Sequence, residues 1–442
     1  MLTQSSNLLS SSSSSLANNE VPRSTFAGVA TALFSALIAS LPFFSVRNAT
    51  LILSPPLLIL LLIIATVLLR SILTLRLRFS VSKFDIGVLV YLAVVSINLS
   101  TVANADGAQY AFIKTLTYVC TYFCLKQMLQ DLSLDSIASS VKNGVFIGSC
   151  LFLATALVCL VLTGQIYAIT KFDYYSLTKS TFASIDAIVG SGQPDDFEGR
   201  DVMRNAVAEA FTLYFLSTLV FKFQSRVANI FILVLNISFV ICTFSRRAFH
   251  AIAIVIFGGS VFDQAGLKRG LSMALLVGSI VLGSLFLHEE SGENRLADLS
   301  DGGRSQQYFD ALDQFSGSPW HGVGFGSKLE RGSYVHNFVL GSAAMMGVAG
   351  LFAALYIYVL TIIQFLIGLA KPRVYNTATF LVIPILGMTV GATFEGLFTI
   401  TSWIAFSLFS HCSNQPANIE RKYAEASSGA LHSQQHSGLQ AR

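Results

Sequence analysis

The residues best suited to chemistry in this chain are arginines and one histidine at the ends of long apolar segments. Arg246 and Arg247 stand in the short connection TFSRRAFH between two apolar stretches, and His336 directly precedes a third. Arginine suits an anion site because its rigid guanidinium pairs with phosphate oxygens and stays charged when partly desolvated. A neutral imidazole can accept a proton from a sugar hydroxyl. These residue types favour an anionic substrate, and a pyrophosphate is the natural anion of a lipid-linked one.

A glycine-rich stretch reads SPWHGVGFGSKLERGSYVHNFVL over residues 318–340. It is not a phosphate-binding P-loop, because that motif needs Gly directly before Lys and Ser327 stands there. Gly322 and Gly324 either present backbone N–H groups to an anion or shape a tight turn. Asn337 either orients the neighbouring histidine or caps the helix that follows.

Spacing and composition argue against metal and nucleic-acid sites. A zinc site needs three or four ligands at short spacings, whereas His321 and His336 are fifteen residues apart with no adjacent cysteine. We therefore expect no metal and no cofactor. No block of Lys and Arg with interleaved aromatic residues is present, so nucleic acid is not an expected partner.

The composition indicates an all-α polytopic membrane protein. Of its 442 residues, 53% are hydrophobic and 12% are charged, whereas soluble domains carry about 25% charged residues. A bilayer core of about 30 Å needs roughly 20 apolar residues per helix, which predicts about 12 transmembrane helices. The last long stretch, 337–367, exceeds one span, so we expect it to tilt or to extend past the bilayer. The predicted spans are 27–46, 50–69, 85–103, 109–126, 143–164, 206–222, 228–244, 248–262, 270–287, 337–367, 376–394 and 396–411.

Basic residues fall in alternate connections, which predicts the orientation of the spans. Because cytoplasmic loops carry an excess of Lys and Arg, both termini are placed in the cytoplasm and two long loops, 165–205 and 288–336, outside. The pair Arg246–Arg247 also falls outside, where it suits an anion site; alternatively, the two spans around it are misjudged and the pair is ordinary cytoplasmic charge. The predicted cytoplasmic connections carry Arg70, Arg76, Arg78, Lys83, Lys126, Lys142, Lys222, Arg226, Lys268, Arg269, Lys371 and Arg373.

The two ends of the chain are polar and are predicted to lie outside the membrane domain. Residues 1–26 are rich in serine and residues 412–442 are polar throughout, so we expect both segments to be disordered. The membrane domain then covers residues 27–411.

Three segments in order resemble the O-antigen ligase and polysaccharide polymerase superfamily, polytopic enzymes that act on polyprenyl-pyrophosphate-linked glycans. ICTFSRRAF, which contains Ser245, resembles the family's Ser-Arg turn between two spans. GRSQQYFDALDQFSGSPWHGVGFGS is similar to its pattern of Arg, an aromatic residue, Pro and alternating glycines. HNFVLGSAAMMGVAGLF resembles its His-Asn helix start with later glycines.

The resemblance implies a mechanism and a place for it. It implies that Arg246, Arg304, Arg247 and Arg200 bind the donor pyrophosphate, and that His336 is the catalytic base. The reaction would be a metal-independent glycosyl transfer with an isoprenoid pyrophosphate as leaving group. It would take place at the periplasmic face of a bacterial inner membrane.

Three functions follow as alternatives. We expect first a glycan polymerase of a surface polysaccharide or exopolysaccharide pathway, and second an O-antigen ligase that transfers the finished glycan to a lipid A core. The third is a transporter of lipid-linked saccharides, which should bury charges mid-membrane and have broken or repeated spans. The expected partners are the polyprenyl-pyrophosphate-linked donor, a glycan or lipid-linked acceptor, the lipid bilayer, and other polysaccharide-assembly membrane proteins.

Overall fold

The chain folds into helices, and the residues described contain no β-strand. These helices are α1 (Arg23–Ser40), η2 (Leu41–Phe43), α2 (Pro55–Thr74), α3 (Lys83–Leu99), α4 (Ala105–Leu129), α5 (Leu134–Leu162), α8 (Phe197–Val220), α9 (Arg226–Cys242), α12 (Arg304–Gly317) and α13 (Phe338–Ala370). The computed structural model describes residues 23–43, 54–74, 81–99, 105–130, 132–167, 197–220, 225–243, 304–327 and 337–370, with short pieces at 180–181, 183–185, 223, 248, 252, 403–404, 407–408 and 410.

The prediction of an all-α membrane protein is confirmed at this level. Four of the described helical segments are long and apolar enough to cross a bilayer: Phe26–Phe43, Pro55–Leu73, Asp135–Leu162 and Phe338–Leu360. The apolar helix α9 is shorter. The count of about 12 spans stays a prediction, because the stretches 248–262, 270–287, 376–394 and 396–411 lie almost entirely outside the described residues.

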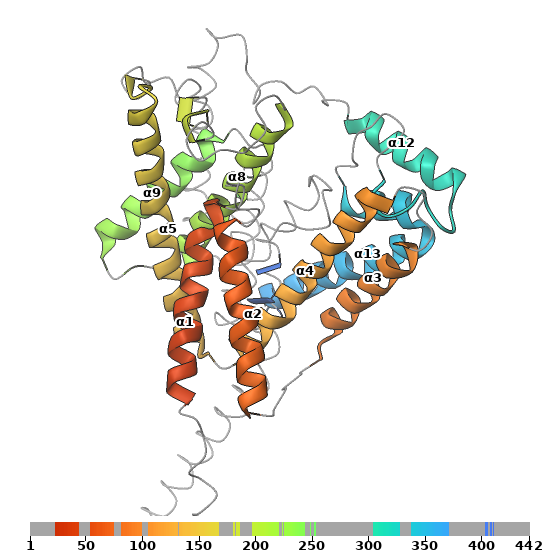
Figure 1. The fold of residues 1–442 in the computed structure, drawn as a ribbon, viewed down its shortest axis with the longest axis horizontal. Coiled ribbons are helices and arrows are strands. Elements are labelled where there is room, and N and C mark those ends of the chain that lie inside the picture. The colour runs from red at the N-terminus through yellow and green to blue at the C-terminus, as the bar shows by residue number, and fades with distance from the viewer. Residues whose placement is uncertain are drawn as a thin grey trace, which may run out of the picture.

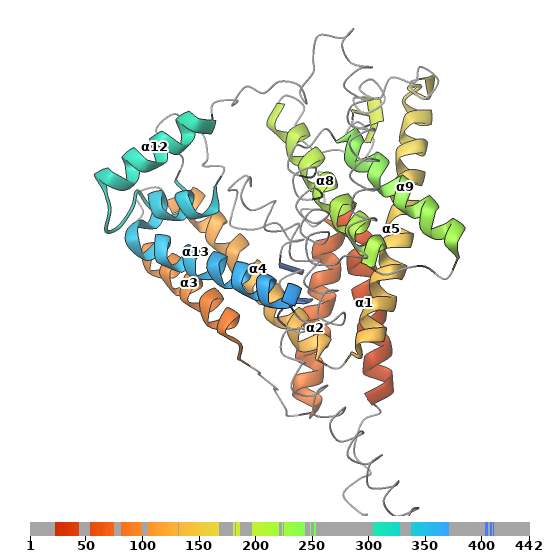
Figure 2. The ribbon, with the colours of Figure 1, turned by 180° about the vertical axis from the view of Figure 1, so that it is seen from behind.

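Successive helices alternate in direction, as the predicted topology requires. Figure 1 shows that α1, α3, α5 and α9 run toward its upper end, whereas α2, α4 and α8 run away from it. Seen from behind in Figure 2, the helices form two groups. One contains α1, α2, α5, α8 and α9, and the other contains α3, α4, α12 and α13.

Small residues allow the close packing of α5 on α1 in the first group. A Cβ atom at Gly144 of α5 would lie 2.7 Å from the backbone oxygen of Ser35 and 2.6 Å from the Cβ of Ile38. Interfaces between membrane helices are rich in such small residues because they let the backbones approach. The hydroxyl of Tyr214 donates to the carbonyl of Ile38, which ties α8 to the same contact.

A buried charge pair ties α3 to α4 in the second group. Lys126, near the end of α4, donates to a carboxylate oxygen of Asp85, in the first turn of α3, and both side chains are almost fully buried. The hydroxyl of Tyr122 donates to the other oxygen at 2.6 Å. Ser82 and Asp85 also cap the start of α3, since the backbone N–H of each bonds to the side chain of the other.

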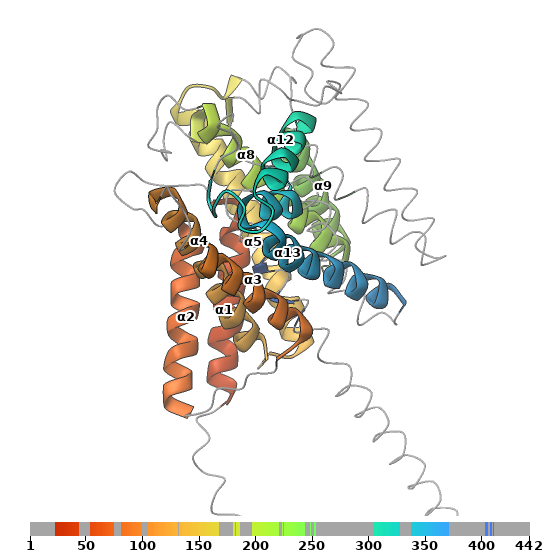
Figure 3. The same ribbon diagram turned by 90° about the vertical axis from the view of Figure 1, so that its right-hand side faces the viewer.

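Helix α13 is broken at Gly347, a feature that the sequence did not predict, and the expected tilt or extension past the bilayer stays a prediction. Gly347 has φ 63° and ψ −152°, so it leaves the helical conformation. A Cβ atom at Gly350 would lie 2.3 Å from the backbone oxygen of Ser342, so the chain folds back sharply at the break, as Figure 3 shows from the side. We call residues 338–346 the short arm and residues 348–370 the long arm. At 1.5 Å per residue the long arm measures about 35 Å and could cross a bilayer core by itself.

Candidate functional site

The glycine loop, residues 318–327, fills the break in α13 and pairs with the end of the short arm. The backbone N–H of Val323 donates to the carbonyl of Ala344 at 3.0 Å, and that of Gly324 donates to the carbonyl of Met345 at 2.9 Å. The last carbonyls of a helix have no partner within the helix. The loop therefore supplies the donors that the short arm lacks at its carboxyl end.

The same loop also pairs with the beginning of the long arm. The backbone N–H of Val348, the first residue after the break, donates to the carbonyl of Pro319 at 2.7 Å. Non-helical backbone at membrane depth is tolerated only where its polar groups are satisfied by protein or water. The loop thus pairs with two carbonyls at the end of the short arm and with one N–H at the start of the long arm, which explains why a glycine-rich loop lies against an apolar helix.

Asn98 of α3 holds the loop from the opposite side. Its side-chain Nδ2 donates to the carbonyl of His321 at 2.8 Å, and its Oδ1 accepts from the backbone N–H of Phe325 at 2.6 Å. Asn98 and Phe325 are both buried. One amide thus clamps two points of the loop four residues apart, and it joins α3 to the α12–α13 segment.

The backbone of the loop decides between the two interpretations of its glycines. Gly322 and Gly324 both have positive φ, at 66° and 104°, where L-residues are disfavoured. Their N–H groups donate to the carbonyls of Ser318 and Met345, so they are not presented to an anion. Gly322 also lies so close to the short arm that a Cβ atom would be 2.2 Å from the carbonyl carbon of Met345. These glycines shape the turn.

Asn337 caps the short arm. Its Oδ1 accepts the backbone N–H groups of Val339 and Leu340, both at 3.0 Å. This is the pattern of an N-cap residue, which satisfies two of the first unpaired donors of a helix. Of the two roles considered for Asn337, the structure shows the cap.

Helix α12 lies on the short arm and runs in the same direction. Ala311 of α12 and Ala344 of the short arm form a small buried cluster, against which Tyr308 and Leu340 pack. Tyr308 and Leu340 each lie about one turn before the buried alanine of their own helix. The two helices therefore run in the same direction, as Figure 2 shows. The first residue of α12, Arg304, and the cap of α13, Asn337, therefore lie at the same end of this helix pair.

For the remaining predicted site residues, the structure describes only the backbone or the neighbouring elements. His336, Arg246, Arg247 and Ser245 lie outside the described residues. Arg200 is in the first turn of α8, and for Arg200, as for Arg304, only the backbone is described. The first turn of α8, the last turn of α9 and all of α12 lie toward the upper end of Figure 1.

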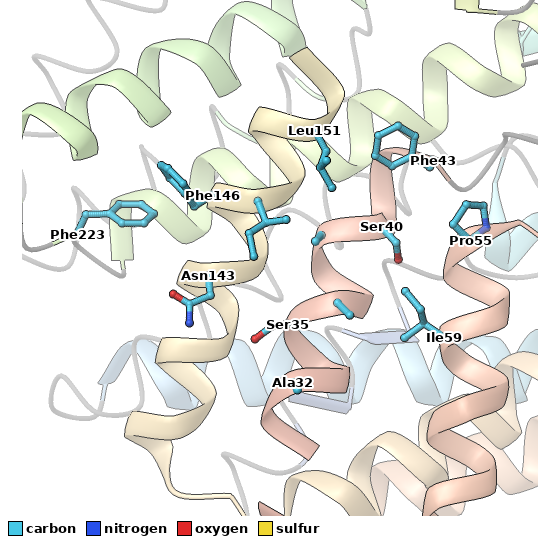
Figure 4. Close-up of a pocket in the computed structure, with 13 residues that line it drawn as sticks. Ala32, Ser35, Ser40, Phe43, Pro55, Ile59, Asn143, Phe146, Leu151 and Phe223 are labelled. Atoms are coloured by element: carbon cyan, nitrogen blue, oxygen red, sulfur yellow. The ribbon is translucent and has the colours of Figure 1, made fainter. Parts of the chain in front are cut away.

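A groove elsewhere in the protein contains none of the predicted site residues. It has a volume of about 850 Å³ and lies between α1, α2 and α5. Figure 4 shows its largely apolar wall, with Phe146 and Leu151 of α5 on one side and Pro55 and Ile59 of α2 on the other. Ser35, Ser40 and Asn143 are its polar side chains. The described residues that line the groove can accept an apolar chain and include no cation for an anionic headgroup.

Two residues that shape the site were not expected from the sequence. Asn98 stands inside a predicted span, and a polar residue at such a depth is a signal of a specific partner. Gly347 belongs to a segment with other glycines, and nothing in its sequence context marks it as the break.

Among the described residues, no group of three or more His, Cys, Asp or Glu side chains could hold a metal ion. No protein-family model matches the chain, and the comparison with curated proteins found no match.

Proposed function

We propose that this protein is an integral membrane glycan polymerase. It transfers a saccharide from a polyprenyl pyrophosphate to a sugar hydroxyl at the outer face of a bacterial inner membrane. Arg246 and Arg304, with Arg247 and Arg200, bind the pyrophosphate, and His336 is the base. The proposal rests on the ordered sequence resemblance and on one structural observation about α12 and α13.

That observation is the common direction of α12 and the short arm of α13. The two helices pack through Ala311 and Ala344 and begin at the same end. Arg304 is the first residue of α12, and His336 directly precedes the cap residue Asn337. This arrangement supports a site in which an arginine and a histidine, distant in sequence, act on one substrate.

The reaction needs only those two kinds of group. The acceptor hydroxyl oxygen attacks the anomeric carbon of the donor while His336 takes the hydroxyl proton. The bond between the anomeric carbon and the pyrophosphate oxygen breaks, and the leaving pyrophosphate keeps the electron pair. Negative charge grows on that group, so fixed guanidinium groups stabilise the transition state more than the ground state.

Two features expected of a transporter occur here without favouring transport. Helix α13 is broken, but the carbonyls of Ala344 and Met345 and the N–H of Val348 beside the break already bond to the glycine loop. Asp85 and Lys126 are buried, but they lie near the ends of α3 and α4 and pair with each other.

A reconstituted assay tests the proposal and separates the alternatives. Purified protein in vesicles receives one polyprenyl-pyrophosphate-linked oligosaccharide, and the length of the lipid-linked glycan is followed. A polymerase lengthens the glycan with this substrate alone. A ligase leaves it unchanged until a lipid A core acceptor is added. Movement of the intact substrate across the bilayer, with no new glycosidic bond, would identify a transporter and contradict the proposal.

A further inference from the structure

Helix α13 covers only part of the apolar face of α12. On a helical projection the apolar side chains of α12 share one face with Arg304 and the two serines, and the acidic and amide side chains occupy the opposite one. Ala311 is buried against the short arm at one edge of this face. Phe309 and Leu312, at the other edge, remain 61% and 47% exposed.

The glycine loop adds two more exposed apolar side chains directly after α12. Trp320 is 74% exposed and Val323 is 39% exposed. The backbone N–H of Val323 bonds to the short arm, and the neighbours of Trp320, Pro319 and His321, accept from the long arm and from Asn98, so the loop that carries these side chains is fixed. We call Phe309, Leu312, Trp320 and Val323 the α12 patch.

The surroundings of the patch fit a lipid surface better than a protein or an aqueous one. The patch is carried by the break of α13, whose long arm, at about 35 Å, is long enough to cross a bilayer core. Tryptophan and other aromatic residues are enriched at the boundary between headgroups and acyl chains.

The charges of α12 specify the kind of lipid. Asp310 and Asp313 stand on its polar face, and the only basic residue of the helix is Arg304 at its start. Interfacial helices that depend on anionic lipid carry Lys and Arg on the polar face. The α12 patch therefore has the chemistry to bind a bilayer by apolar contact, without attraction to anionic headgroups.

We propose that α12 is an interfacial helix, and that Phe309, Leu312 and Trp320 insert into the outer lipid leaflet beside α13. A helix of this kind buries its apolar face about 5–10 Å into the boundary between headgroups and acyl chains. The glycine loop and the start of α13 are then fixed at the depth of the lipid headgroups. The inference goes beyond the proposed reaction and does not depend on it.

Tryptophan fluorescence tests this directly, because the chain has only two tryptophans, Trp320 and the buried Trp403. A Trp403→Phe variant in phosphatidylcholine vesicles reports on Trp320 alone. We expect a blue-shifted emission that lipids brominated near the carbonyl end of the acyl chains quench strongly. Aqueous iodide should quench it weakly, and added anionic lipid should change nothing. If Trp403→Phe does not fold, the difference between the wild-type protein and a Trp320→Phe variant gives the same signal.

Two further variants calibrate the depth. Leu62, exposed in the middle of α2, is replaced by Trp in a chain without the two native tryptophans, and lipids brominated near the chain ends should quench it best. Replacing Phe309 and Leu312 by serine should weaken the lipid quenching of Trp320. Strong quenching of Trp320 by iodide, or shielding from both iodide and brominated lipid, overturns the proposal, because the patch would then face water or protein.

Discussion

Replacing Gly322 by alanine should destabilise the protein through two separate effects. Gly322 has φ 66°, and a left-handed backbone costs an L-residue about 1–2 kcal/mol. The new Cβ atom would also stand 2.2 Å from the carbonyl carbon and 2.3 Å from the carbonyl oxygen of Met345. Overpacking of a tight interior typically costs about 1–3 kcal/mol. Because the obstacle is backbone, the loop must shift and weaken its bonds to the short arm, so we expect a loss of about 2–5 kcal/mol.

Alanine substitutions at two other glycines separate the cost of the positive φ from the cost of the close contact. Gly164 also has positive φ, at 69°, but has open space where a Cβ atom would stand, so Gly164→Ala should cost only about 1–2 kcal/mol. Gly317 has open space and no positive φ, so Gly317→Ala should not destabilise. The free energy of unfolding of the three variants is measured in mixed micelles by titration with a denaturing detergent. If Gly322→Ala lowers the free energy of unfolding by no more than Gly164→Ala does, the close packing of the loop on α13 is refuted.

Three further variants test other contacts. Asn98→Ala removes the clamp and leaves the buried N–H of Phe325 without its acceptor, so the free energy of unfolding should fall by about 1–3 kcal/mol; an unchanged value contradicts the clamp. Asp85→Asn leaves Lys126 as a buried charge without its partner carboxylate, and breaking such a pair costs about 3–5 kcal/mol in the same measurement. The double variant Asp85→Asn, Lys126→Met should recover part of that loss; a double variant less stable than Asp85→Asn argues against the ion pair.

The sequence predicted the helices more reliably than their packing. The apolar runs around α1, α2 and α5 mark these helices, because membrane spans need long unbroken apolar stretches, although α5 begins at Leu134, well before the predicted span 143–164. The break in α13 escaped prediction because a glycine in an apolar run costs little by itself. Its left-handed conformation is selected by the loop backbone that packs against it, which is a tertiary effect.

In the candidate site, too, a local feature was predictable from the sequence and the tertiary contacts were not. The N-cap role of Asn337 follows from local chemistry and was one of the two expected roles. The alignment of α12 with the short arm was not predictable, because it depends on the fold-back at Gly347 and on small residues at Ala311 and Ala344. The clamp by Asn98 joins residues more than two hundred positions apart, and the sequence alone gives no sign of which residues Asn98 pairs with.

The most direct test of the central claim compares three alanine variants in the reconstituted elongation assay. His336→Ala should slow elongation by about 10²–10⁴-fold, the usual contribution of a general base. Arg304→Ala should slow it by about 10²–10³-fold, as loss of one transition-state donor does. Arg226→Ala is the matched control, because Arg226 is an exposed arginine at the start of α9, away from α12, and it should elongate at the wild-type rate. Wild-type elongation by His336→Ala and Arg304→Ala protein would contradict the account.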